Sequence, residues 1–251
     1  VGITPKSEGR PGERLARALT EAGPSFIKLG QALSTRSDLL GEEMTTDLAQ
    51  LQDNLPPFAA DLARATIAEE LGAPVDELFA EFDDHAIAAA SIAQVHFAVT
   101  HDGRKVAVKV LRPDIEAAFQ RDVDLLTWIA EIAERTQPQL RRLKPIASIA
   151  TLAETVELEM DLRFEAAAAA ELAENFKDDP EFKVPEVDWQ LTARRVLTTE
   201  RLIGGIPLDD RDEIVAAGHD PVKILTRAAA ASFRQVFRDG FFHADTHPGN
   251  M

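Results

Sequence analysis

Residues 105–110 read Lys-Val-Ala-Val-Lys-Val, and this stretch decides the fold of the 251-residue chain. Valine alternates here with other side chains, which predicts a strand with one buried face. The dipeptide Asp102-Gly103 comes just before it, and residues 94–100 form another strand-like stretch before that turn. Because Asp-Gly is a strong signal for a two-residue hairpin turn, we predict that these two strands pair in an antiparallel sheet.

Lys109 lies near the end of this predicted strand. On the inner face of a sheet its ammonium group must find an anion, because an unpaired buried charge is costly. On an edge strand it would point into solvent. The tetrapeptide Val106–Lys109 alone does not decide between these two interpretations.

The pattern around the hairpin alternates between strands and helices. We predict a first strand over residues 78–87, and the small-residue stretch Ala88-Ala89-Ala90-Ser91-Ile92-Ala93-Gln94 separates it from the second. Pro113 ends the third strand. Long helices are expected over 114–135 and 146–176, the second of which contains five consecutive alanines.

Both ends of the chain have helical periodicity. In the first 75 residues we predict helices at 12–22, at 25–36 with Ser25 as the cap, around 44–51, and at 59–71. Short β-rich stretches follow Pro185 and lead into Gly204-Gly205, which is typical of a hinge; helices over 210–217 and 221–238 come next. We therefore divide the chain into a helical extension (1–75), a sheet-containing part with a helical insertion (76–203) and a final part (204–251).

Composition excludes several classes of protein. The net charge is −16, so a nucleic-acid groove is not expected. No cysteine is present, which agrees with a reducing compartment, and no run of about 18 apolar residues predicts a membrane span. We expect a cytoplasmic chain and leave open a place at the inner face of a membrane.

Residues 1–40 differ from the rest, because they carry six basic and four acidic side chains, a net charge of +2. Three arginines flank the apolar stripe of the first predicted helix: Arg10, Arg14 and Arg17. This helix either packs on the domain or makes a peripheral contact with an anionic membrane, and packing is the commoner outcome for an amphipathic helix.

An acidic run occurs in the second long predicted helix. Asp161 and Glu165 are one turn apart on one face, with Glu159 offset from them. Such runs are usually solvated. In the functional interpretation, one carboxylate pairs with Lys109 and the others hold a cation or a second lysine.

The stretch His243-Ala-Asp-Thr-His-Pro-Gly-Asn250 allows three interpretations. An aspartate followed five residues later by an asparagine is the spacing of a kinase catalytic loop, which supplies a base and a magnesium ligand. His243, Asp245 and His247 have instead the composition of a transition-metal site. Pro248-Gly249-Asn250 also suits a surface turn.

The order of these parts favours the kinase interpretation, and at these residues the chain resembles the UbiB/AarF family of atypical, protein-kinase-like ATPases of isoprenoid quinone biosynthesis. The family's motifs appear, in order, as Lys28-Leu-Gly-Gln31, the alanine-rich loop Ala88–His96, Glu159-Met-Asp161 and His243–Asn250. The resemblance implies an α+β, protein-kinase-like fold. It would have an antiparallel N-lobe sheet, an N-terminal helical extension and the start of a C-lobe.

The family also implies roles for individual residues. Lys109 would pair with the nucleotide phosphates and with Glu165, Asp245 would be the catalytic-loop aspartate, and Asn250 would bind Mg²⁺. The remaining expected nucleotide contacts are Ala88, Ala89, Ala90, Ser91, Glu200 and Leu202. The expected family-specific motif over the cleft comprises Lys28, Gln31, Glu159 and Asp161.

The resemblance implies an ATP- and Mg²⁺-dependent atypical kinase or ATPase, with ADP as the other nucleotide, rather than a conventional protein kinase. Its acceptor would be a small lipid-like molecule, and its partners would be quinone-biosynthesis proteins. The alternative is a non-catalytic, nucleotide-gated scaffold. A flavin hydroxylase is disfavoured, because no Gly-x-Gly-x-x-Gly follows a strand. Met251 precedes any Asp-Phe-Gly-type aspartate, so we expect these 251 residues alone to turn over little ATP.

Overall fold

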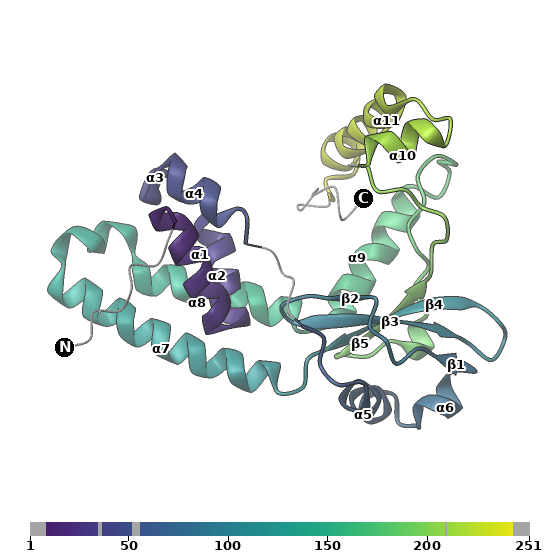
Figure 1. Ribbon diagram of the computed structural model, residues 1–251, viewed down its shortest axis with the longest axis horizontal. Helices are drawn as coiled ribbons and strands as arrows, with labels where there is room; N and C mark the ends of the chain where they lie inside the picture. The colour runs from purple at the N-terminus through teal and green to yellow at the C-terminus, as the bar shows by residue number, and fades with distance from the viewer. Residues whose placement is uncertain (1–8, 35–36, 52–55, 209, 243–251) are drawn as a thin grey trace.

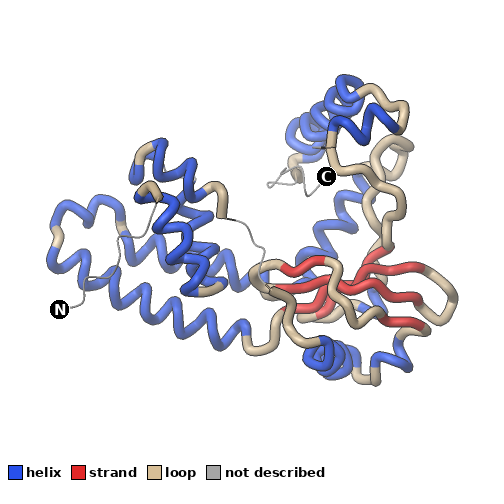
Figure 2. The backbone as a smooth tube through the Cα atoms, viewed as in Figure 1, coloured by secondary structure: helices blue, strands red, loops and turns tan. Residues whose placement is uncertain are grey.

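The computed structural model describes residues 9–34, 37–51, 56–208 and 210–242. A group of helices lies to one side of a β-sheet, and a single helix, α9 (Leu162–Asn175), rises from the sheet toward the last helices of the chain (Figures 1 and 2). Those last helices are α10 (Arg211–Ala216) and α11 (Pro221–Arg234), and a π-helical turn over Gln235–Asp239 follows them.

The sheet is antiparallel, as the sequence predicts. Its strands are β1 (Glu81–Phe82), β2 (Ala88–Ala89), β3 (Ala93–Val99), β4 (Lys105–Leu111) and β5 (Val196–Glu200). The main path runs β1-β3-β4-β5, and β2 also pairs with β3. Together with the many helices, this sheet confirms the α+β fold class.

The β3–β4 turn is longer than the predicted two-residue hairpin. Thr100 N donates to Arg104 O at 3.0 Å, and Gly103 N donates to Thr100 O at 2.9 Å, so the loop contains three residues. Of its central residues, Gly103 has a positive φ, of 86°, whereas Asp102 does not. This combination is typical of a type I turn followed by a glycine bulge, and it leaves Asp102 free to bind neighbouring side chains.

The predicted first strand over residues 78–87 is confirmed only at Glu81–Phe82. Leu78 ends the short helix α6 (Val75–Leu78), and the strand reduces to β1 and β2 with a turn between them. The polar run Asp83-Asp84-His85 causes the interruption, since Asp83 Oδ1 accepts a hydrogen bond from His85 N at 2.9 Å. A side chain that binds its own backbone in this way competes with strand pairing.

The two faces of the sheet are covered differently. Val106, Val108 and Val110 point to one face and are almost fully buried against α6 and α5 (Ala60–Leu71). Sequence periodicity grouped residues 60–71 with the N-terminal extension, but α5 packs on the sheet. On the opposite face, α9 covers the end of the sheet near Leu111 and Leu197.

Two long helices form a hairpin beside the sheet. They are α7 (Ile115–Thr136) and α8 (Pro145–Glu159), which are joined by a 3-10 segment, Pro138–Leu143. The single helix predicted over 146–176 is wrong, because α8 ends at Glu159 and α9 begins at Leu162. Asp161 causes the break, since its side chain accepts from Arg163 N and so acts as the N-cap of α9.

The N-terminal helices pack on this hairpin (Figure 1). They are α1 (Pro11–Ala22), α2 (Pro24–Ser34), α3 (Ser37–Leu40) and α4 (Glu42–Leu48). Because α2 begins at Pro24, Ser25 lies inside the helix and not at the predicted cap. Leu19 and Leu15 of α1 pack around Leu48 and Leu51, so the apolar stripe of α1 is used inside the protein.

Gly30 of α2 lies directly against the side chains of Leu19 and Leu51. A Cβ atom there would come within 2.3 Å of Leu51 Cδ1 and 2.8 Å of Leu19 Cδ1. We expect Gly30→Val to lower the free energy of unfolding by about 1–3 kcal/mol, the usual cost of overpacking. Urea unfolding measures it. Gly205→Val is the matched control, because no atom lies within 4 Å of a Cβ at that position; equal losses would contradict the packing.

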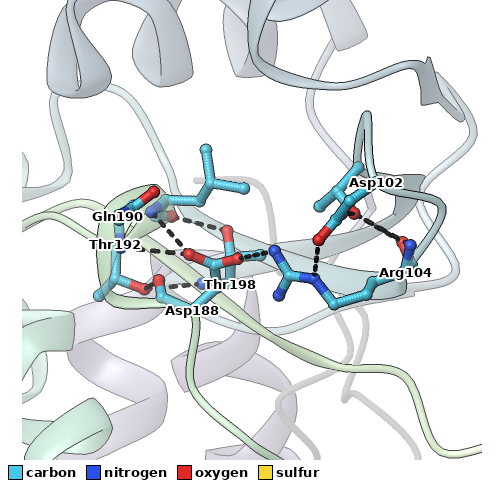
Figure 3. Close-up of polar contacts among 8 residues, drawn as sticks. Asp102, Arg104, Asp188, Gln190, Thr192 and Thr198 are labelled. Carbon is cyan, nitrogen blue, oxygen red and sulfur yellow. Dashed lines mark hydrogen bonds and ion pairs between the residues drawn. The ribbon is translucent and has the colours of Figure 1, made fainter.

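The β3–β4 turn is held to the segment before β5 (Figure 3). Arg104 forms ion pairs with Asp102, at 2.7 Å, and with Asp188, at 2.8 Å. Asp188 also accepts hydrogen bonds from the backbone N–H groups of Gln190 and Leu191. Hydrogen bonds from the Thr100 hydroxyl and from Arg104 lower the pKa of Asp102 to about 2.

This lowered pKa gives a pH dependence. A carboxylate whose pKa is lower in the folded state stabilises the protein above its unfolded-state pKa, and the stabilisation is lost as the pH falls. For Asp102 the loss runs from about 4 down to about 2. We expect Asp102→Asn to be less stable than the parent protein at pH 6, and the difference to shrink as the pH is lowered. Urea unfolding at several pH values tests this, and a difference that stays constant would contradict it.

Candidate functional site

The sheet has one partly open face, on the side opposite α5. Along β4 this face carries Lys105, Ala107 and Lys109, which alternate with the buried valines. Ala107 lies between Phe97 of β3 and Thr199 of β5, and Lys109 lies beside Val95. Ala107 is partly exposed, and its side chain is smaller than that of either neighbour.

Lys109 forms an ion pair with Glu165 at the edge of this face. Its Nζ atom donates to both carboxylate oxygens, at 2.9 and 2.7 Å. The side chains are 30% and 49% exposed, so the pair remains accessible to a ligand from solvent. The structure thus brings together two predicted site residues that are 56 positions apart in the sequence.

The N-terminus of α9 places Glu165. Leu162 N donates to Arg194 O at 2.8 Å, which fixes the first turn of α9 to the chain before β5. Ala166 is fully buried against the sheet, and its neighbour Glu165 therefore lies at the rim. Asp161 caps the helix and pairs with Arg163 at 2.6 Å, and the Arg163 hydrogen bond lowers the pKa of Asp161.

The alanine-rich loop closes the same end of the sheet. Ala88 and Ala89 form β2, and Ala90 N donates to Ala93 O at 2.7 Å. Arg112 donates to Ala90 O from two of its guanidinium nitrogens, at 3.2 and 3.0 Å, and to Pro56 O at 2.8 Å. Burial lowers the pKa of Arg112. The group stays charged, so this loop has a cation beneath it.

Ser91 lies at the tip of this loop. It is 1% exposed, and its hydroxyl has no hydrogen-bond partner among the described residues. A buried polar atom of this kind is uncommon in native structures.

The motif Lys28–Gln31 meets the α8–α9 junction. Lys28 Nζ lies 2.9 Å from Glu159 Oε2, and the Lys28 side chain is mostly buried. Gln31 donates to Leu51 O at 3.4 Å, inside the helical group. Of the two acidic residues expected to face Lys28, Glu159 forms an ion pair with it, and Asp161 serves as the N-cap of α9.

Glu200, the last residue of β5, and Leu202, two positions beyond it, are the residues that the sequence analysis expects at a hinge. Glu200 pairs with Lys183 at 2.5 Å, and that hydrogen bond lowers the pKa of Glu200; Leu202 is half exposed. Between this segment and β4 lies a pocket of about 280 Å³. The guanidinium of Arg201 stacks 3.3 Å from the centre of the Phe97 ring.

Sequence reasoning missed Arg112 and Arg201. Each follows directly on a strand that was recognised, so a search for cations at strand ends could have found them. Asp245 and Asn250, with the alternative ligands His243 and His247, lie outside the described residues. Within the described part of the chain, no cluster of three or more His, Asp or Glu side chains could hold a metal ion. No helix in that part is long and apolar enough to cross a membrane.

Residues 50–251 match the model of the ABC1 atypical kinase-like domain. The chain belongs to this family. A relative named "Probable protein kinase UbiB" from Marinobacter nauticus is 45% identical over 99% of this chain and 45% of its own length. Proteins of the same name from Pseudomonas aeruginosa and Xylella fastidiosa are 43% and 44% identical, over 98% and 99% of this chain.

The chain thus spans less than half the length of these curated relatives. Among solved structures it is similar to that of Rv3197 from Mycobacterium tuberculosis, described as a complex with erythromycin. The TM-score is 0.65 and the identity 31%, over 94% of this chain and 55% of the other. The kinase-like fold predicted from the order of the motifs is confirmed.

The Lys28–Glu159 pair can be tested by exchanging its charges. We expect Lys28→Glu to lower the free energy of unfolding, because it places two carboxylates side by side. The double variant Lys28→Glu/Glu159→Lys should recover about 0.5–1 kcal/mol, the upper range for a partly exposed pair. Urea unfolding of both single variants and the double variant measures the coupling. Strictly additive losses would show that the two side chains do not interact.

Proposed function

We propose that this chain forms the nucleotide-binding part of an ATP-dependent atypical kinase or ATPase. The observation that carries the proposal is the Lys109–Glu165 ion pair at the rim of an open sheet face. A lysine in this position is held by its carboxylate partner but remains partly solvated, so its ammonium group can also bind a phosphate oxygen.

The residues around the pair suit a nucleotide. The face formed by Val95, Ala107 and Thr199 would take the base, and Lys109 the α- and β-phosphates. The backbone of Ala88–Ser91 would lie over the phosphates, with the Arg112 guanidinium adding positive charge below that loop. Ala90 limits how closely a phosphate approaches the backbone, compared with glycine.

Catalysis requires Mg²⁺, which when bound neutralises negative charge on the phosphates. In this proposal Asn250 is one of the Mg²⁺ ligands. Asp245 orients the nucleophile or accepts its proton. Glu165 acts only through Lys109, which it orients. Glu200 and Leu202 belong to the hinge beside the base.

The acceptor is proposed to be a small or lipid-like molecule of isoprenoid quinone biosynthesis, on the basis of the relatives' name UbiB. A nucleotide-gated scaffold is the second candidate. The Lys28–Glu159 contact favours it, because it connects the helical extension to the junction from which Glu165 projects. Single-turnover ATP hydrolysis with Asp245→Ala separates these candidates, since a scaffold would bind nucleotide equally well and show no Asp245-dependent turnover.

Replacing the lysine of the pair tests the nucleotide site. In the protein at its natural length, Lys109→Met should weaken Mg²⁺-ATP binding by about tenfold or more, as expected for losing one charged hydrogen bond. Isothermal titration calorimetry measures the affinity.

Lys177→Met is the matched control. Lys177 also pairs with a glutamate, Glu174 at 2.5 Å, but it lies beyond the far end of α9. We expect the Lys177→Met variant to bind Mg²⁺-ATP with the same affinity as the parent protein. Equal affinity in the Lys109 variant and the parent protein would refute the site.

A further inference from the structure

Arg201 stacks on an aromatic ring of the open sheet face. Its guanidinium group lies 3.3 Å from the centre of the Phe97 ring, a separation that two planar groups reach only when they lie flat on each other. Phe97 is the direct neighbour of Ala107 across the β3–β4 pair. The guanidinium group therefore lies next to the place over Ala107 that the proposed function gives to the base.

The end of β5 places Arg201 on this face. Arg201 N donates to Lys105 O at 3.0 Å, so the pairing of β4 with β5 continues by one residue past Glu200. Successive side chains of a strand alternate between its two faces. Because Thr199 pairs with Ala107, Arg201, two positions later, lies on the same face as both.

Three carboxylates line the pocket to which Arg201 contributes, and none of them pairs with it: Glu186, Asp188 and Glu200. Glu200 pairs with Lys183 at 2.5 Å, and Asp188 pairs with Arg104 at 2.8 Å. Within the described part of the chain, the Arg201 side chain makes the ring contact but no hydrogen bond or ion pair.

The donors of Arg201 are therefore available to a ligand. A guanidinium group carries five N–H donors, all directed in its own plane. Since that plane is parallel to the Phe97 ring, the donors point sideways from the stack and not into the ring. A flat ligand beside the stack would present its edge to them.

We propose that Arg201 recognises the nucleoside half of the nucleotide by donating N–H groups to acceptor atoms at the edge of the base. This inference rests on the proposed function and deepens it. Opposite residues of an antiparallel pair have Cβ atoms about 4.5–5.5 Å apart, so a base over Ala107 and the guanidinium over Phe97 lie side by side in one layer. Ring nitrogens of a purine accept hydrogen bonds in the plane of the ring. In this arrangement Lys109 holds the phosphates and Arg201 the nucleoside.

A purely structural role would give Arg201 a different effect. If the guanidinium only covered Phe97, an apolar side chain of similar length would replace it without changing nucleotide affinity. Arg201→Met is such a replacement, because methionine keeps a flexible apolar chain over the ring. Arg201→Lys keeps the charge but lacks the planar set of donors.

Isothermal titration calorimetry of the protein at its natural length tests the proposal with two ligands, Mg²⁺-ATP and magnesium tripolyphosphate, which lacks the nucleoside. We expect Arg201→Met to weaken Mg²⁺-ATP binding about tenfold, as for the loss of one charged hydrogen bond, and to leave tripolyphosphate affinity unchanged. Arg201→Lys should not restore the affinity for Mg²⁺-ATP. Lys109→Met should weaken the binding of both ligands, because its ammonium group contacts the phosphates.

Lys105→Met is the matched control. Lys105 is exposed on the same face and pairs with Arg201 through its backbone carbonyl. This variant removes one positive charge from the same end of the face but no planar donor. We expect its ratio of Mg²⁺-ATP affinity to tripolyphosphate affinity to equal that of the parent protein.

Three results would overturn the role of Arg201: equal losses for both ligands in Arg201→Met, no loss for either, or parent-like Mg²⁺-ATP affinity in Arg201→Lys. If Lys109→Met weakens Mg²⁺-ATP binding and Arg201→Met does not, the nucleotide site stands and only the role of Arg201 fails. If the parent protein binds no Mg²⁺-ATP, the proposed function fails and this inference fails with it. Urea unfolding of each variant confirms that the protein titrated is folded.

Discussion

The ion pair between Lys109 and Glu165 requires the first turn of α9 to be packed against the sheet, and the arrangement of the site depends on that packing. The pair forms only if α9 begins beside the sheet with Glu165 in its first turn. Asp161 meets this requirement by ending α8 and capping α9 in its place. An uninterrupted helix would continue along the direction of α8. Glu165 would then lie away from β4, and Lys109 would lack its partner.

The α8–α9 junction is held from both sides by lysines of other elements. Glu159 precedes the break and pairs with Lys28 of α2, whereas Glu165 follows it and pairs with Lys109 of β4. Glu159 and Glu165, which are six positions apart, therefore connect the helical extension to the open face of the sheet. Met160 and Leu162, which lie between the two glutamates, are buried. Because buried side chains are closely packed, a shift of α2 would be transmitted through this junction to α9. This arrangement gives the motif Lys28–Gln31 a physical route to the position of Glu165.

Sequence reasoning recovered the elements whose signals are local and repeated. The valines of β4 alternate without interruption, so the strand follows from the period of two, whereas that pattern alone left open whether Lys109 faces an anion or solvent. The acidic run then suggested a carboxylate partner for Lys109, and the family resemblance assigned that role to Glu165. The break at Asp161 was missed because its neighbours are good helix formers and one capping side chain outweighed them. The first strand failed for a similar reason, because the Asp83 side chain binds nearby backbone. In both cases a single short side chain overrode the periodicity of a longer window.

The charge of the chain constrains how such a site can work. A protein with a net charge of −16 repels a polyphosphate at long range, so binding depends on cations placed at the site itself. In the proposed site these are Lys109, which is already shared with Glu165, and Arg112, which lies under the alanine-rich loop. The Glu165 carboxylate would repel the phosphates of a nucleotide bound at Lys109. This repulsion is reduced in the proposed site, because the Lys109 ammonium group lies between the two anions and a bound divalent cation lowers the charge of the nucleotide. In the proposed site, Glu165 would thereby favour a metal-bound nucleotide over a bare one, and phosphate recognition by Lys109 would be coupled to the metal ligand proposed at Asn250.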